Sequence, residues 1–182
     1  LSEAALTDAE RTEYLNYIND SSTNQLQLVN YLLDWSNLQT GRMHMEPHRV
    51  QAQGLVFNCI SALTGVAMRK NIEIKVNVPD SIFIEADERL MLQVITNLVS
   101  NAIKFSEDGK TIRISAERFN NELVEFVISD EGVGIPDNYH QRIFKFEKMF
   151  STRGTRGEKG TGLGLSLVKE IVERHKGQIW FY

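Results

Sequence analysis

The sequence predicts an α+β fold: a two-layer α/β sandwich in which helices cover one face of a mixed, mostly antiparallel sheet, preceded by a long N-terminal helix. Helical patterns and antiparallel strand patterns follow one another along the chain in an order typical of such sandwiches. Two alternating runs, 111–118 and 123–129, are expected to form an antiparallel hairpin. We expect a helical region at 1–42 and a sandwich domain at 43–182.

Residues 8–40 are expected to form one long helix. Asp8 is a candidate N-cap, the acidic Glu10 follows in the first turn, and no Pro or Gly interrupts the pattern before Gly41. Apolar residues recur at a spacing that suits packing against a partner helix. Two interpretations stay open: a helix that lies on its own domain, or a hairpin or bundle with a second chain. The apolar positions are Leu15, Ile18, Leu26, Leu28, Val29, Leu32, Leu33 and Trp35.

The remaining elements follow from periodicity. Apolar residues at helical spacing indicate helices, and strict alternation of apolar and polar residues indicates strands. Asp87 is expected to cap the third helix, and Asn120-Asn121 to join the two hairpin strands. The expected elements are an extended piece at 43–50, helices at 51–69, 87–105 and 162–175, and strands at 72–78, 82–84, 111–118, 123–129 and 178–182.

Composition excludes several classes of protein. The 182 residues are 42% hydrophobic and 24% charged, as in soluble globular proteins, and the net charge of −4 disfavours nucleic-acid binding. The single cysteine, Cys59, stands among apolar residues and is expected in the core of a protein from a reducing compartment. Without an apolar run of bilayer length or a signal-peptide pattern, we expect a cytoplasmic segment that contacts no membrane. Membrane anchoring of a longer protein is left open.

A polar stripe on the helix at 87–105 is the first candidate site. Gln93, Asn97, Asn101 and Lys104 recur at helical spacing opposite the apolar face, although asparagine is a poor helix former. An amide oxygen is a suitable ligand for Mg²⁺, and a lysine one turn later could meet phosphate charge. A merely solvated polar face is the alternative for this stripe.

Two glycine-containing segments follow. Asp130 directly follows a strand and precedes Gly132 and Gly134. Its carboxylate could accept a hydrogen bond from the exocyclic amine of adenine. The alternative for this segment is a turn with no binding role. The basic, glycine-rich stretch 153–164 runs straight into a helix, whose N-terminus favours an anion. This predicts a phosphate-binding lid that matches neither a P-loop nor a dinucleotide motif. A plain flexible loop is the alternative for 153–164.

These segments together resemble the four nucleotide-binding boxes of bacterial sensor histidine kinases. Residues 97–105 look like the N box and 130–134 like the G1 box, and residues 8–42 are similar to the second helix of the dimerisation and phosphoacceptor hairpin. The F box is represented by Ile143-Phe144 with Phe150, and the G2 box by 160–165.

The resemblance implies an ATP-binding sandwich of the gyrase, chaperone and histidine-kinase type, with ATP and Mg²⁺ as cofactors. The resemblance implies that Asn97, Asn101 and Lys104 are catalytic residues: Asn101 would hold Mg²⁺, and Asn97 and Lys104 would lie at the phosphates. Asp130 would recognise adenine. Gly132 and Gly134 would shape the base pocket, and Gly160, Gly162 and Gly164 would let the lid close. The other nucleotide contacts expected are Ile135, Phe150, Arg156, Lys159, Thr161, Leu163 and Leu165.

The resemblance also implies phosphoryl transfer from Mg-ATP to a protein histidine, and then to an aspartate of a response-regulator receiver domain. Hydrolysing relatives usually carry a glutamate where this chain has Asn97, and an amide cannot act as a general base at neutral pH. The full-length protein is expected to form a homodimer through the helical hairpin. The alternatives are a serine kinase of the anti-sigma-factor type and a nucleotide-binding pseudokinase that acts as an interaction module.

The sequence departs from the family pattern in two places. None of His44, His48, His140 and His175 is followed by the acidic residue of a phosphoacceptor box, so we expect the acceptor histidine to lie outside this segment. The last strand of the sheet is also expected to be missing, because the chain ends shortly after Ile179.

Overall fold

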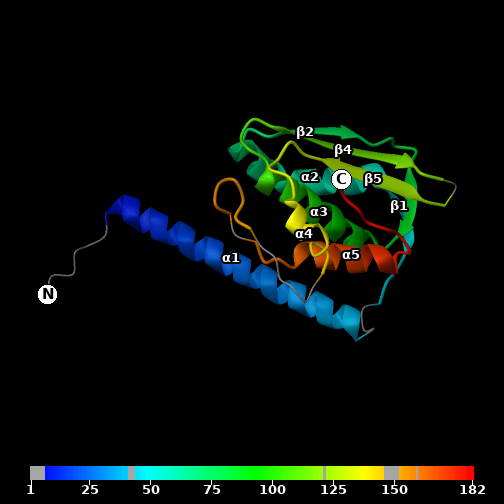
Figure 1. The fold of residues 1–182 in the computed structure, drawn as a ribbon, viewed down its shortest axis with the longest axis horizontal. Coiled ribbons are helices and arrows are strands. Elements are labelled where there is room, and N and C mark those ends of the chain that lie inside the picture. The colour runs from blue at the N-terminus through cyan, green and yellow to red at the C-terminus, as the bar shows by residue number, and fades with distance from the viewer. Residues whose placement is uncertain (1–6, 41–43, 121, 146–151, 159) are drawn as a thin grey trace.

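The structure is a computed structural model that describes residues 7–40, 44–120, 122–145, 152–158 and 160–182. Figure 1 shows strands along one side of a domain, helices against them, and the long helix α1 (Asp8–Gln39) on the side away from the strands. Helix α1 contacts α5 (Gly164–Arg174). Among the described helices, none has the length and apolar character needed to cross a membrane.

Helix α1 forms over nearly the predicted range, but its N-cap differs from the prediction. The hydroxyl of Thr7 accepts a hydrogen bond from the Glu10 amide at 3.3 Å, and the Glu10 carboxylate accepts one from the Thr7 amide at 2.9 Å. This reciprocal pair is a capping box, so Asp8 is the first helical residue and not the cap. The predicted helix end at Gly41 lies outside the described residues.

The main core lies between two helices and a three-stranded sheet. Helices α2 (Ala52–Arg69) and α3 (Glu88–Phe105) pack on β2 (Glu73–Asn77), β4 (Thr111–Arg118) and β5 (Val124–Ser129). The strand order is β2-β4-β5, with β2 parallel and β5 antiparallel to β4, which confirms the predicted mixed sheet and hairpin. Buried core residues include Val56, Cys59, Ile95, Val99, Ile103, Ile112 and Ile114.

The strand predicted at 82–84 does not join this sheet. Strand β3 (Phe83–Ala86) instead pairs antiparallel with β1 (His48–Gln51), which forms from the predicted extended piece, and Val50 lies opposite Ile84. The expectation of one sheet is therefore wrong in this respect. The partner of β3 comes from the segment just before α2, and the Ala52 amide donates to the Ile82 carbonyl at 3.0 Å where the two segments meet.

The C-terminal segment is not the predicted strand. Among the described residues, 178–182 pair with no strand. Their apolar side chains pack on helices instead: Ile179 lies against the second apolar cluster, built from α3 and α5, and the Phe181 ring contacts the rings of His140 and Phe144. His140 ends the short helix α4 (Asp137–His140).

Helix α3 begins as predicted, with Asp87 as its N-cap. One carboxylate oxygen accepts from the Leu90 amide at 3.0 Å and the other from the Glu46 amide at 3.2 Å. Burial acts to raise the pKa of Asp87, but these two amide hydrogen bonds, together with the nearby charges of Arg89 and His175, outweigh it, and the pKa lies below the ordinary value of 3.8. Asp87 thus fixes the start of α3 and joins it to the segment that follows α1.

We expect Asp87→Ala to lower the free energy of unfolding by about 1–2 kcal/mol, because two amides lose their acceptor. Since the folded-state pKa is depressed, this contribution should be present above pH 3.8 and disappear as the pH falls below it. Urea denaturation followed by circular dichroism tests both statements. Asp8→Ala, at the exposed start of α1, is the matched control and should change stability by less than about 0.5 kcal/mol. Equal losses in the two variants would contradict the role of Asp87.

Candidate functional site

Glycines bring three segments close to α3: the loop after β5, the loop 152–158 and the start of α5. A Cβ atom at Gly132 would lie 2.6 Å from the Phe105 carbonyl oxygen, and one at Gly154 would lie 2.8 Å from the Lys104 carbonyl oxygen. A Cβ atom at Gly164 would lie 2.8 Å from the Asn97 side-chain oxygen. No side chain fits at these distances, so the absence of a Cβ lets the segments reach the helix. The structure therefore gathers the predicted motifs around the C-terminal half of α3.

Asn97 is held from two sides. Its side-chain nitrogen donates to the Gln93 carbonyl at 2.9 Å, and its oxygen accepts from the hydroxyl of Tyr31 at 2.5 Å. Tyr31 belongs to α1, and its ring packs on the cluster shared by α3 and α5. Sequence reasoning did not assign Tyr31 to the site. The sequence signal that could have identified it is a tyrosine, which has an apolar ring and a polar hydroxyl, within the apolar row of α1.

Asn101 lies one helical turn after Asn97 and is half-buried. Its side chain makes no hydrogen bond to any residue that the structure describes. The amide oxygen is therefore available as a hard ligand, and Mg²⁺ commonly combines one or two protein oxygens with water and phosphate oxygens. Asn101 fits the predicted metal position.

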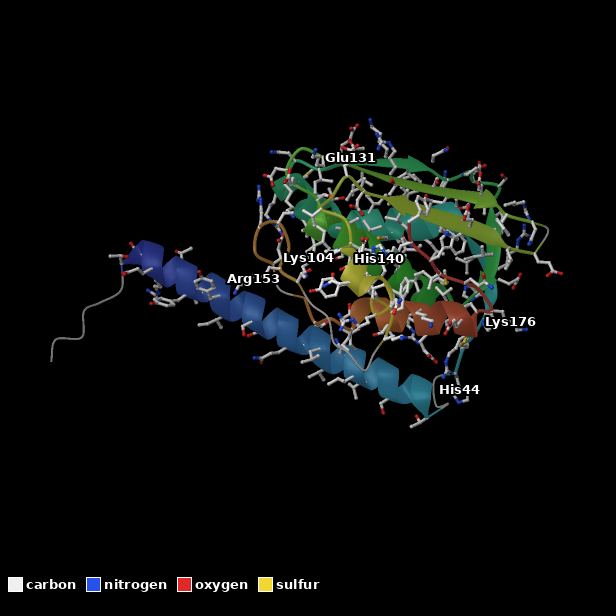
Figure 2. The ribbon with its side chains drawn as sticks, viewed as in Figure 1. His44, Lys104, Glu131, His140, Arg153 and Lys176 are labelled. Atoms are coloured by element: carbon white, nitrogen blue, oxygen red, sulfur yellow. The ribbon has the colours of Figure 1, made fainter. Side chains whose placement is uncertain are left out.

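Lys104 lies where the glycine-rich loop meets α3. Its ammonium donates to the Thr152 carbonyl at 3.2 Å and lies 4.7 Å from the centre of the Phe105 ring. Burial lowers the pKa of Lys104, and the nearby Glu158 carboxylate opposes this shift. Figure 2 labels Lys104 on α3 and Arg153 on the loop, close to this junction. The geometry thus places a cation beside the loop predicted to cover phosphate.

Asp130 and its glycines lie on the other side of the Phe105 carbonyl. One oxygen of Asp130 accepts from the Gly132 amide at 2.9 Å, and the Val133 amide donates to Phe105 at 3.2 Å. Gly134 has φ = +68°, a left-handed conformation that glycine adopts without strain. The Asp130 side chain is exposed.

The family model for "Histidine kinase-, DNA gyrase B-, and HSP90-like ATPase" matches residues 86–182, just over half of the chain. The chain belongs to this ATPase family. It is 38% identical over 159 residues to hybrid signal transduction histidine kinase D of Dictyostelium discoideum, a match that covers 85% of the chain and 10% of the relative. The chain spans 10% of that relative's length and 41% of the length of adaptive-response sensory kinase SasA of Prochlorococcus marinus, which is 36% identical over 82% of the chain.

Solved structures agree with this assignment. Full-length ShkA in complex with AMPPNP is 28% identical, with a TM-score of 0.70 over 93% of this chain and 35% of that one. Histidine kinase ThkA in complex with response regulator protein TrrA has a TM-score of 0.75 at 22% identity, over 98% of this chain and 49% of that one, and shows the shared fold. The predicted resemblance to a sensor histidine kinase catalytic core, and the predicted fold class, are confirmed.

The foot of the predicted lid, residues 152–158, is tied by charges to the segments that follow α3 and α2. Arg156, predicted to contact nucleotide, forms an ion pair with Asp108. Glu158 accepts a hydrogen bond from the ammonium of Lys70 at 2.9 Å. Burial acts to raise the pKa of Glu158, but the hydrogen bond from Lys70 and the Arg156 amide outweigh it and lower that pKa. Lys70 was missed at the sequence level because a lysine at a helix end is usually a surface residue.

The other predicted nucleotide contacts are spread over the lid and its neighbours. Leu163 is buried in the protein, Leu165 and Thr161 are half-buried, and Gly162 has φ = +74°. The exposed Gly160 precedes them, and the Ile135 carbonyl lies 2.7 Å from the Nε2 atom of His140. Phe150 and Lys159 lie outside the described residues.

A separate open cavity of about 560 Å³ lies at the opposite end of α3. Its lining includes His44, Glu46, His48 and Asp87, none of which was predicted to bind nucleotide. At 1.5 Å per residue, Asn101 is about 20 Å further along the helix. The cavity is therefore not part of the candidate nucleotide site.

We expect Gly132→Ala to lower the free energy of unfolding by about 1–3 kcal/mol, because the new methyl group would overlap the Phe105 backbone. Denaturation in urea, followed by circular dichroism, measures the change. Gly54→Ala in α2 is the matched control: its Cβ has room, and alanine should raise stability by up to about 1 kcal/mol. Unchanged stability of Gly132→Ala would contradict the close approach.

Proposed function

We propose that this chain is the catalytic core of a two-component sensor histidine kinase, which transfers the γ-phosphoryl group of Mg-ATP to a protein histidine outside residues 1–182. The observation that carries the proposal is the approach of Gly132, Gly154 and Gly164 to α3 around the predicted phosphate residues. The phosphoryl group would then pass to an aspartate of a receiver domain. The division into a helical region at 1–42 and a catalytic domain at 43–182 is part of this proposal.

The proposed site divides its tasks among three parts of the chain. Asn101 would hold Mg²⁺, which when bound neutralises charge on the phosphates. Lys104 would hold a phosphate oxygen as a compact cation, next to the lid whose foot it contacts through Thr152. Asp130 would accept a hydrogen bond from the adenine amine. Phosphoryl transfer depends mainly on positioning and charge neutralisation, and these residues supply both.

Asn97 supports transfer to a histidine over hydrolysis. Its amide is oriented by Gln93 and Tyr31, so it is a fixed polar group that can position a phosphate or an incoming side chain. An amide cannot remove a proton from water at neutral pH. A water molecule beside Asn97 would therefore lack a general base.

The described histidines support an acceptor outside this segment. The rings of His48, His140 and His175 each lie within hydrogen-bonding distance of a backbone carbonyl oxygen. His175 is held further because its Nε2 atom accepts from the Asp87 amide at 3.1 Å. These contacts are those of ordinary surface or packing residues.

The exposed apolar row of α1 supports the proposed homodimer through a helical hairpin. The row includes Leu15, Ile18 and Leu33, whose exposed fractions are 59%, 62% and 57%. Such a row on one helix suits the core of a four-helix bundle.

The complex of ThkA with TrrA supports a receiver domain as the second partner. The long α1 also argues against an anti-sigma-factor type kinase.

We expect Asn101→Ala to remove the Mg²⁺ dependence of ATP-analogue binding. The affinity measured with Mg²⁺ should fall about tenfold or more, to the value measured without the metal. Loss of a residue that only orients a metal ligand already lowers metal affinity by about that factor, and Asn101 would be the ligand itself. Calorimetric titration with a non-hydrolysable analogue, with and without Mg²⁺, measures this. Asn58→Ala, an exposed asparagine on α2, is the matched control. An unchanged Mg²⁺ dependence would exclude Asn101 as the ligand.

We expect Asp130→Asn to weaken ATP binding by about tenfold, because a charged acceptor at the adenine amine becomes a neutral amide. Binding of GTP, which lacks that amine, should be weak in the parent and little changed in the variant. Glu131→Gln is the matched control, because the neighbouring carboxylate pairs with Arg113 at 3.1 Å. Equal affinities of the parent for ATP and GTP would remove the basis for the role of Asp130.

A further inference from the structure

Lys70 is a buried charge that the proposed chemistry leaves unused. The residue is 2% exposed, and it directly follows α2. Its ammonium donates to the carbonyl oxygens of Ile103 at 2.8 Å and Lys104 at 3.0 Å, to the hydroxyl of Thr155 at 2.7 Å and to the carboxylate of Glu158 at 2.9 Å. Burying an ammonium is costly unless it is paired and hydrogen-bonded, and here every donor has an acceptor.

The acceptors of Lys70 come from two elements that are far apart in the sequence. Ile103 and Lys104 belong to the last turn of α3, where free carbonyl groups and the helix dipole favour a cation. Thr155 and Glu158 belong to the foot of the lid. A single ammonium therefore joins the lid to the end of the helix that carries the proposed phosphate residues.

The foot of the lid is itself a rigid turn. The Gly154 amide donates to the Glu158 carbonyl and the Gly157 amide to the Gly154 carbonyl, both at 2.9 Å, with Gly157 at φ = +80°. The Glu158 carboxylate also accepts from the Arg156 amide at 2.9 Å. Because Glu158 is part of this turn, Lys70 holds the whole foot and not one side chain.

The same turn also contacts one of the carbonyl groups that Lys70 binds, that of Lys104. The Thr155 amide donates to the Lys104 carbonyl at 3.1 Å, and the Thr155 hydroxyl lies 2.7 Å from the Ser106 carbonyl. A Cβ at Gly154 would collide with Lys104. Any loosening of the turn therefore moves the lid relative to the Lys104 side chain.

We propose that Lys70 is a positioning residue for phosphate binding: its contacts with Thr155 and Glu158 hold the lid against α3, so that the lid and Lys104 face the same phosphates. This inference rests on the proposed function, because it takes the loop to be a nucleotide lid. Lys70 does not touch the nucleotide, so its effect should be confined to the part of the ligand that the lid covers.

The test compares ATP and adenosine as ligands of the 182-residue chain and its variants. In Lys70→Met the affinity for the ATP analogue should fall about tenfold, since one charged hydrogen-bond network is lost, while the adenosine affinity stays within about twofold. Lys75→Met is the matched control, because Lys75 is exposed and pairs only with Glu73 among the described residues. Equal losses for both ligands, or an unchanged ATP affinity, would overturn the proposal.

A second variant guards against misfolding of Lys70→Met. Thr155→Val removes the hydroxyl that accepts from Lys70 and donates to the Ser106 carbonyl, and it leaves the buried lysine in place. It should lower ATP affinity about threefold without changing adenosine affinity. The double variant should lose less than the sum of the two single losses, because both substitutions break the Lys70–Thr155 contact. Fully additive losses would overturn the proposal.

Hydrogen exchange measured without nucleotide distinguishes the positioning role of Lys70 from the proposed nucleotide-binding function. Lys70→Met should speed exchange of the Gly154, Thr155 and Gly157 amides about tenfold, while the amides of α2 and α3 exchange at the parent rate. Faster local exchange in a chain that binds no ATP would uphold the tether but refute the nucleotide lid. Parent-like exchange in a chain that does bind ATP would refute the role of Lys70 and leave the proposed function standing.

Discussion

The structure depends on one constraint: three segments must reach α3 at distances that exclude a Cβ atom. Gly132 lies against Phe105, Gly154 against Lys104, and Gly164 against Asn97. Because these contacts involve the helix backbone or a doubly held amide, the neighbours cannot move aside at low cost. The glycines therefore fix where the segments lie relative to the polar stripe of α3. The geometry of the candidate site, which separate segments of the chain build, is in this way set by α3.

Helix α3 is in turn fixed at both ends by buried charge. Asp87 satisfies amides at the N-terminus, and Lys70 satisfies carbonyl groups at the C-terminus, so each charge has the sign that the helix dipole favours. Each residue also binds a second element, the segment before β1 or the foot of the lid. The groups that hold the helix in place are thus the groups that connect it to the rest of the protein.

Elements set by local patterns were predictable, and contacts set by distant segments were not. The periodicity of α3 and the β4–β5 hairpin identified both elements, and the ordered glycine motifs located the candidate site. The pairing of β3 with β1 was missed, because alternation predicts a strand without naming its partner. Lys70 could not be told from a surface lysine, because its burial depends on a loop 85 residues away, which includes Thr155.

The contact between Tyr31 and Asn97 gives α1 a direct connection to the candidate site. The hydroxyl of Tyr31 is held at 2.5 Å from the Asn97 oxygen while its ring packs on the α3–α5 cluster. A hydrogen bond of this length is lost when the two atoms separate by about 1 Å more. A small displacement of α1 would therefore free the Asn97 oxygen, while Gln93 still holds the amide nitrogen. The position of α1 is in this way linked to the hydrogen-bonding state of one proposed phosphate residue.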